Sequence, residues 1–144
     1  MQKDERSERD QRHRRQSCEG SSERVRATSG FQNDLRDRTK SFAVSIVRMF
    51  SALPKTTEAQ VLGKQLLRSG TSIGANYREA FRARSKLEFI AKCGDSLREI
   101  EETAYWLELL VAVKIVLPEN LEPLVRECSE LTAIFVTIIK QAKE

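Results

Sequence analysis

Apolar side chains recur at steps of three and four residues through four successive segments of the chain, and this pattern constrains the fold more than any other feature. Such spacing places the apolar side chains on one face of an α-helix. The breaks between the segments are short, so neighbouring helices must run antiparallel. The sequence therefore predicts an all-α fold over residues 31–144, an antiparallel up-down-up-down four-helix bundle with helices at residues 34–53, 57–84, 85–114 and 119–143.

The breaks carry the start and stop signals of helices. A proline follows the first segment and another precedes the fourth, and proline lacks the N–H that a helix interior needs. Thr56 or Thr57 is expected to cap the second helix. Ser85 and Glu88 form a capping-box pattern, which predicts a sharp turn just before residue 85. Pro123 is compatible with the fourth helix if it lies in the first turn, where its missing donor costs little.

Each helix contributes one apolar stripe to the expected core, because four amphipathic helices bury their stripes against one another. The stripe positions, helix by helix, are Leu35, Phe42, Ile46, Met49, Phe50 and Leu53; Leu62, Leu66, Ile73, Tyr77 and Phe81; Leu87, Ile90, Cys93 or Gly94, Leu97, Ile100, Ala104, Leu107 and Val111; and Leu121, Leu124, Cys128, Leu131, Phe135 and Ile138. Gly63, Gly70 and Gly74 share one face of the second helix, so a neighbouring helix is expected to approach closely there.

The third and fourth helices carry more apolar residues than one stripe holds. A monomer would leave this surplus exposed to water, and large exposed apolar patches mark interfaces. We therefore expect a homo-oligomer with an interface that includes Tyr105, Trp106, Leu109, Ile134 and Ile139.

The N-terminal segment, the hydropathy pattern and the cysteine spacing each exclude certain classes of protein. Residues 1–30 contain almost no large apolar side chain, which predicts a disordered charged tail. No apolar run is long enough to span a bilayer and the start lacks a signal-peptide core, so we expect a cytoplasmic protein without membrane contact. Cys18, Cys93 and Cys128 are too widely spaced for a disulfide framework or a zinc site. The second and third of these cysteines are expected to be small buried hydrophobes.

The sequence also argues against catalysis. Its one histidine, His13, lies in the predicted tail, which leaves no histidine in the bundle for a Ser-His-Asp site, a Cys-His site or a di-iron site. No glycine-rich phosphate loop is present. The best catalytic candidates are the carboxylates of Glu79, Glu99 and Glu102, but such groups near an arginine are more often structural. We expect no enzyme, no cofactor and no metal.

A polar stripe runs down the second helix beside the apolar one, formed by Arg68, Ser72, Asn76 and Glu79. Folding the chain about the turn near residue 84 sets Arg68 opposite residues 100–102, so a pair with Glu101 or Glu102 is expected. Two interpretations stay open. One is a groove for a ligand or RNA. The other is a structural polar network that fixes the helix register and consists of Arg68, Ser72, Asn76, Glu79 and Glu102.

Charge is distributed unevenly along the bundle. Residues 64–92 hold seven basic and two acidic side chains, whereas residues 95–130 hold three basic and nine acidic ones. Basic residues gathered at the tip of the second and third helices would bind phosphates, although charge at a helix end also serves solvation. No aromatic platform is expected beside them, so any binding would be weakly sequence-specific. The candidate nucleic-acid-binding residues are Lys64, Arg78, Arg82, Arg84, Lys86 and Lys92.

Three groups of residues follow one another in a recognisable order: Gln65, Leu66, Arg68, Ser69, Ser72, Ile73, Asn76 and Glu79; Glu88, Phe89 and Ile90; and Glu102, Thr103, Tyr105, Trp106 and Leu107. Together they resemble the signature of the bacterial four-helix-bundle family encoded in intervening sequences of 23S ribosomal RNA genes. The sequence departs from this pattern at Tyr77, commonly isoleucine, and at Ala80, commonly glycine. Both replacements are compatible with a helix.

This resemblance implies a bundle that assembles as a ring-shaped homopentamer without a catalytic site. The family is similar to the accessory bundle proteins of diversity-generating retroelements, which bind a reverse transcriptase and nucleic acid through a basic surface. The leading hypothesis is therefore an oligomeric accessory or scaffold protein that binds nucleic acid, RNA or DNA. The alternative is a protein-binding accessory subunit, for example of a reverse transcriptase, without direct nucleic-acid contact.

Overall fold

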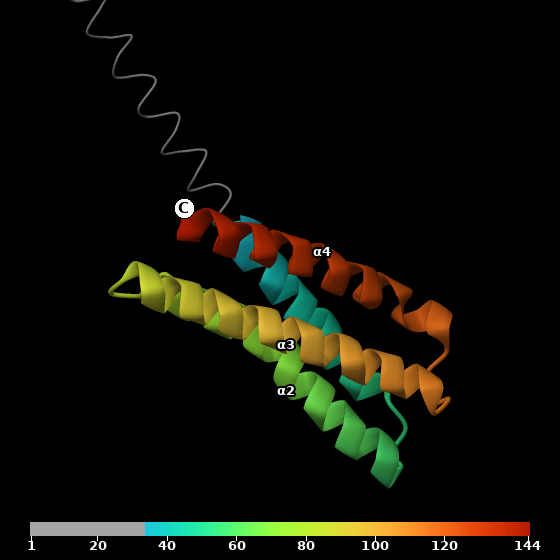
Figure 1. Ribbon diagram of the computed structural model, residues 1–144. Helices are drawn as coiled ribbons and strands as arrows, with labels where there is room; N and C mark the ends of the chain where they lie inside the picture. The colour runs from blue at the N-terminus through green and yellow to red at the C-terminus, as the bar shows by residue number, and fades with distance from the viewer. Residues whose placement is uncertain (1–33) are drawn as a thin grey trace, which may run out of the picture. The chain divides into compact units, whose positions relative to one another are not determined.

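The expected helices are present in the computed structural model, which describes residues 34–144. The first helix covers residues 34–52 of the described part, and it is followed by α2 (Thr57–Ala80), α3 (Lys86–Ala112) and α4 (Pro118–Lys143) (Figure 1). No strand occurs among the described residues, so the predicted all-α class is confirmed. The predicted tail at residues 1–30 lies outside the described residues.

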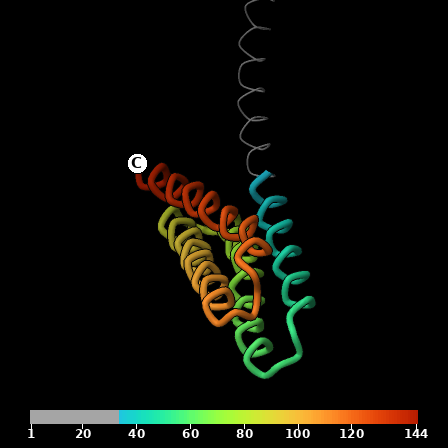
Figure 2. Tube along the Cα trace, turned by 90° about the vertical axis from the view of Figure 1, so that its right-hand side faces the viewer, coloured from blue at the N-terminus to red at the C-terminus, as the bar shows by residue number. Residues whose placement is uncertain are grey.

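The helices form an antiparallel bundle within the unit Arg36–Glu144 (Figures 1 and 2). α2 packs on α3, and α3 packs on α4. The first helix closes the bundle by contacting α4, where the Arg38 guanidinium pairs with the Glu127 carboxylate at 2.5 Å. Across the core, the rings of Tyr77 in α2 and Phe135 in α4 meet edge to face, with centroids 5.5 Å apart. One core therefore joins all four helices.

Glycines let the first helix approach α2 closely. A Cβ atom added at Gly70 would lie 2.8 Å from Cγ1 of Ile46, and one added at Gly74 would lie 3.0 Å from Oγ1 of Thr39. A Cβ at Gly63 would lie 2.6 Å from Cδ1 of Leu53. Real Cβ atoms essentially never come closer than 3.0 Å to another heavy atom, so a larger residue on this face would make the neighbouring side chains or the first helix shift. The predicted close approach on this face is confirmed.

α2 ends at Ala80, four residues before the predicted end. The cap of α3 explains the difference. Ser85 is extended, with φ −147° and ψ 160°, and its hydroxyl accepts a 3.1 Å hydrogen bond from the Glu88 N–H. The Glu88 carboxylate in turn accepts a 3.1 Å hydrogen bond from the Arg84 N–H. Because this reciprocal cap needs an extended chain before α3, α2 cannot continue to residue 84.

The α3 stripe also differs from the prediction. Leu87, placed in the core by its spacing, is 80% exposed because it lies in the first turn of α3, before the helix reaches the core. The buried face of α3 instead includes two hydroxyl residues, and it consists of Cys93, Ser96, Ile100, Thr103, Leu107 and Leu110. The predicted stripe had Leu97 and Ala104 in place of Ser96 and Thr103, one residue further along.

α4 begins with Pro118, and Pro123 lies inside the helix rather than in its first turn. The expectation for Pro123 was therefore wrong, because a turn holds about 3.6 residues and Pro123 is the sixth residue of α4. α3 ends at Ala112, two residues earlier than predicted, and Lys114 just beyond it adopts a left-handed conformation with φ 62°. The N–H of Ile115 then donates a 3.0 Å hydrogen bond to the Leu110 carbonyl, which completes the helix end.

The two glycine environments predict opposite effects of one substitution. Gly70→Ala should destabilise the protein by about 1–2 kcal/mol, because overpacking against Ile46 outweighs the roughly 1 kcal/mol gained in helix propensity. Gly94→Ala is the matched control, since nothing lies within 4 Å of a Cβ there, and it should stabilise by up to about 1 kcal/mol. Urea unfolding followed by circular dichroism measures both. Equal effects of the two substitutions would contradict the close approach.

Candidate nucleic-acid interface

A cluster of cations lies where α2 turns into α3. Arg78 belongs to the last turn of α2, Arg82 and Arg84 lie in the connection at residues 81–85, and Lys86 is the first residue of α3. All four side chains are exposed. We call these residues, Arg78, Arg82, Arg84 and Lys86, the basic tip.

Acidic residues do little to neutralise the basic tip. Glu79 pairs with Lys92 at 2.7 Å, and the Lys92 ammonium lowers the pKa of the Glu79 carboxyl while Glu79 raises the pKa of Lys92. The carboxylate of Glu88 accepts the hydrogen bond from the Arg84 backbone N–H. Among the ion pairs of residues 34–144, none includes a side chain of the basic tip. The charge of Arg82 adds to that of Lys92 in lowering the pKa of Glu79, so the cations of the tip stay outside the ion pairs of residues 34–144 with one acidic neighbour nearby.

The structure does not gather all six candidate binding residues at one place. Lys92 is engaged by Glu79 across the two helices. Lys64 precedes Arg78 by fourteen residues in α2, which corresponds to about 21 Å along a helix. Four of the six candidates therefore share the tip, while Lys92 lies beside it in an ion pair and Lys64 lies far along α2.

The topology brings further cations to the same end of the bundle. Lys140 and Lys143 lie in the last turn of α4, and α4 ends where α3 begins because the two helices are antiparallel (Figure 1). Arg36 of the first helix is close enough to act on the pKa of Tyr77, in the last turns of α2. Sequence reasoning missed these residues because it counted charge along segments. Combining the predicted topology with the basic last turn of the fourth helix would have found the two lysines.

An aromatic ring accompanies the basic tip, contrary to expectation. Phe81 directly follows α2 and is 40% exposed, although its spacing had assigned it to the core. Its ring makes edge-to-face contacts with Tyr77, at a centroid distance of 4.9 Å, and with Phe89, at 6.3 Å. Phe81 is the C-cap residue of α2 and keeps a helical backbone, with φ −70° and ψ −17°, and Arg78 and Arg82 lie within four residues of it in sequence.

The polar network between α2 and α3 differs in its members from the predicted one. The Thr103 hydroxyl lies 2.9 Å from the Ser69 hydroxyl, and both residues are buried. The Ser96 hydroxyl donates a 2.9 Å hydrogen bond to the Ile73 carbonyl. Together these bonds set positions 69 and 73 of α2 opposite 103 and 96 of α3. The predicted register was therefore close, but the buried residues that make the cross-helix bonds are uncharged hydroxyls.

The predicted network residues lie nearer the surface. Arg68 is exposed and pairs with neither Glu101 nor Glu102, because the smaller Ser69 takes the buried position beside α3. Ser72 donates a 2.7 Å hydrogen bond to the Arg68 carbonyl of its own helix, and Asn76 is half-buried. The Glu102 carboxylate accepts a 3.2 Å hydrogen bond from Nε1 of Trp106. Only Glu79, through Lys92, forms an ion pair between the two helices.

The carboxylates named as catalytic candidates and the two thiols of the bundle have different surroundings. Glu79 pairs with Lys92, while burial, followed by the nearby Glu102 charge, raises the pKa of Glu99. Burial raises the pKa of the Cys93 thiol to about 11 and that of Cys128 to about 12, so both stay protonated near neutral pH. No group of metal-ligating side chains occurs within residues 34–144. His13 lies outside the described residues.

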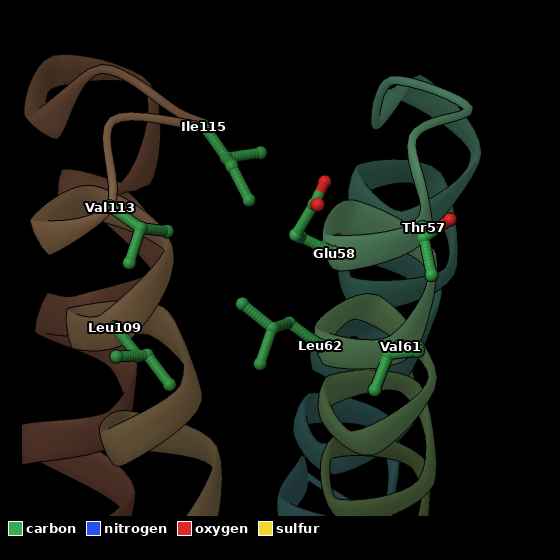
Figure 3. Close-up of a pocket in the computed structure, with 7 residues that line it drawn as sticks. All are labelled: Thr57, Glu58, Val61, Leu62, Leu109, Val113 and Ile115. Atoms are coloured by element: carbon green, nitrogen blue, oxygen red, sulfur yellow. The ribbon is translucent and has the colours of Figure 1, made fainter.

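The opposite end of the α2/α3 hairpin carries an open apolar groove of about 640 Å³. In Figure 3, Leu62 from α2 and Leu109 and Ile115 from the α3 side point into the gap between the helices. Val61 and Val113 line its walls and are 56% and 50% exposed. This apolar groove is separated from the basic tip by the length of the hairpin.

The expected interface residues are spread over several surfaces. Leu109 lines the apolar groove, and the half-buried Trp106 lies one turn before it in α3. Tyr105 is 56% exposed, and its ring contacts the Trp106 ring at a centroid distance of 5.1 Å. Ile134 and Ile139 are half-buried in α4 and do not line this groove.

Comparison with known proteins agrees with this architecture. The model of the 23S rRNA-intervening sequence protein family matches residues 32–137. The chain belongs to this family. A crystal structure of a protein with unknown function from the S23 ribosomal protein family, from Bacteroides thetaiotaomicron, is 42% identical and aligns with a TM-score of 0.69. The alignment covers 73% of this chain and 97% of that one. No curated protein matches the sequence.

The family assignment agrees with the sequence resemblance and leaves the activity open. Within the described part of this 23S rRNA-intervening sequence family member, no helix has the length and apolar character needed to cross a bilayer. Two surfaces of residues 36–144, the basic tip and the apolar groove, support a functional proposal.

Removing the buried hydrogen bond between Thr103 and Ser69 should lower the free energy of unfolding measurably. Thr103→Val keeps the side-chain shape but removes the hydrogen bond to Ser69, and it should destabilise by about 1 kcal/mol. Thr137→Val is the matched control, because the Thr137 hydroxyl bonds only within α4 and is exposed, so its cost should be near zero. Urea unfolding compares the two variants. A Thr103→Val protein as stable as the Thr137→Val protein would contradict the role of the pair.

The raised thiol pKa values predict low cysteine reactivity. In a Cys18→Ser variant, Cys93 and Cys128 should not react with a disulfide reagent at pH 8 until guanidinium chloride unfolds the chain. The pKa of the Cys93 thiol is about 11 in the folded protein and ordinarily 9.0. The protonated thiol, which predominates in both states below pH 9, is therefore the form that the folded state prefers. Stability should therefore fall as the pH rises from 9 towards 11. Rapid reaction of a native thiol at pH 8 would show that the core is open.

Proposed function

We propose that this family member is a non-enzymatic accessory protein that assembles as a homo-oligomer and binds nucleic acid, RNA foremost, through its basic tip. The observation that carries the proposal is the group of exposed cations at the tip, outside the ion pairs of the described residues. Lysine and arginine that neutralise phosphates release condensed counterions, which makes such binding favourable at moderate salt. Lys140 and Lys143 add to the positive potential of the same end.

Oligomerisation is part of the proposal. Exposed apolar side chains such as Val61, Val113 and Tyr105 gain stability when a second copy covers them. The resemblance described above implies a homopentamer. In such an assembly several tips would act on one nucleic acid, so weak single contacts would add to a strong one. Sedimentation equilibrium of the full chain would measure the number of copies.

The apolar groove favours a second candidate function, a protein-binding accessory subunit without nucleic-acid contact. Val61, Leu62, Leu109, Val113 and Ile115 offer a concave apolar surface of the kind that receives a partner's side chains. A reverse transcriptase is one candidate partner, by the similarity to retroelement accessory proteins. A pull-down that retains a protein partner after nuclease treatment, and loses it in a Leu109→Glu variant, would favour this function over the first.

Charge reversal at the basic tip tests the leading proposal. Arg82→Glu combined with Lys86→Glu should weaken the binding of a fluorescein-labelled RNA by about tenfold or more, because two phosphate contacts are lost. The slope of log K against log salt concentration should also fall by roughly 0.7–0.9 for each contact. Fluorescence anisotropy at several salt concentrations measures both quantities.

The matched control changes the same charge at the other end of the bundle. Arg48 and Lys55 are exposed near the end of the first helix, and Arg48→Glu with Lys55→Glu should leave RNA affinity almost unchanged. If both pairs of substitutions weaken binding equally, the tip is not a site and the binding reflects total charge. If neither pair has an effect, the proposed function is wrong.

A further inference from the structure

The exposed ring within the basic tip has no role in a surface that reads phosphates alone. Phe81 is 40% exposed, and the exposed Arg78 and Arg82 lie within one turn of it in sequence. Leu87, in the first turn of α3, is 80% exposed at the same end of the hairpin. Phosphates offer nothing to an apolar ring, whereas a ligand with an apolar face could use the exposed part of Phe81.

The ring is held in place before any ligand arrives. Tyr77 contacts it edge to face at 4.9 Å, and Phe89 contacts it at 6.3 Å, from the two helices that the tip connects. Tyr77 is itself buried and packs against Phe135 in the core. A ring fixed in this way loses little conformational freedom when another ring stacks on it, which favours binding.

We infer that the basic tip takes single-stranded nucleic acid, with an unpaired base stacked on the Phe81 ring between the phosphate-binding cations. The inference rests on the proposed function and specifies the form of nucleic acid. A base within a duplex already has both of its faces covered by neighbours, whereas an unpaired base can offer one to an aromatic side chain. Arginine side chains beside the ring, such as Arg78 and Arg82, can also stack on a base.

Electrostatics alone predicts a preference for duplex over single-stranded nucleic acid, so the two explanations can be distinguished by experiment. A duplex has a higher charge density than a single strand, and each phosphate contact on it releases more counterion. A surface that uses only Arg78, Arg82, Arg84 and Lys86 should therefore bind a duplex at least as tightly as a single strand. A preference for the single strand requires contact with the bases.

Three labelled probes separate these contributions with the unmodified protein. They are a fifteen-nucleotide RNA without self-complementarity, its duplex with the complementary strand, and a strand of equal length with an abasic backbone. The single strand should bind more tightly than the duplex. The abasic strand, which keeps the phosphates, should bind about tenfold more weakly than the natural strand because the stacked base is absent. These comparisons need no variant to fold.

Variants of Phe81 then locate the contact. Phe81→Leu keeps an apolar side chain without a ring, and it should weaken binding of the natural strand by about tenfold while leaving the abasic strand unaffected. Phe81→Trp keeps a ring and should retain the binding. Val47→Ala is the control, because it trims another exposed apolar side chain, 44% accessible, in the second half of the first helix and outside the basic tip. It should not change the affinity.

The outcomes distinguish this inference from the proposed function. If duplex and abasic probes bind as tightly as the natural strand, and Arg82→Glu with Lys86→Glu still weakens binding by about tenfold or more, stacking is wrong and the proposed function stands. If charge reversal leaves every probe unaffected, the proposed function fails and the inference fails with it. A third outcome concerns lipid. If Phe81→Leu keeps its RNA affinity but no longer sediments with phosphatidylserine vesicles that bind the unmodified protein, the ring belongs to a lipid-binding surface and the inference is wrong.

Discussion

The reciprocal cap at the start of α3 determines the geometry on which the rest of the hairpin depends. The Ser85 hydroxyl and the Glu88 carboxylate bind backbone N–H groups that no helix could satisfy at that point. Ser85, extended at φ −147° and ψ 160°, interrupts the helical backbone before α3, and α2 ends at Ala80 with Phe81 still helical at its C-cap. The short connection limits how the two helices can pair, and Ser69 meets Thr103 in the resulting register.

The apolar spacing of Phe81 does not lead to full burial. Phe81 follows Ile73 and Tyr77 on the same stripe, and as the C-cap residue it keeps a helical backbone, with φ −70° and ψ −17°. Its ring contacts Tyr77, but α2 has ended and 40% of the residue faces water. Arg78 and Arg82 lie within four residues of it in sequence. A residue at the end of an apolar stripe can therefore belong to the core and to the surface.

The sequence predicted the number, order and direction of the helices because periodicity and capping are local properties of the chain. The glycine face was predictable for the same reason, since Gly63, Gly70 and Gly74 share one side of a single helix. The buried hydroxyls were not. Ser96 and Thr103 look like surface residues until Ile73 and Ser69 of α2 supply their partners, so a stripe chosen by hydrophobicity shifts to Leu97 and Ala104. The position of Lys140 and Lys143 at the same end of the bundle as the basic tip was also missed, because only the antiparallel topology brings these distant segments to one end.

The two ends of the α2/α3 hairpin have different chemistry, and this separation bears on how they would work together. The apolar groove, with Leu62 and Leu109, opens at the start of α2, whereas the basic tip lies at its end. The 24 residues of α2 between them correspond to about 36 Å. A partner or a second copy in the groove would leave the tip uncovered. Self-repulsion between tips would also oppose contact at the basic end, so association at the apolar end is the arrangement in which oligomerisation and phosphate binding do not compete.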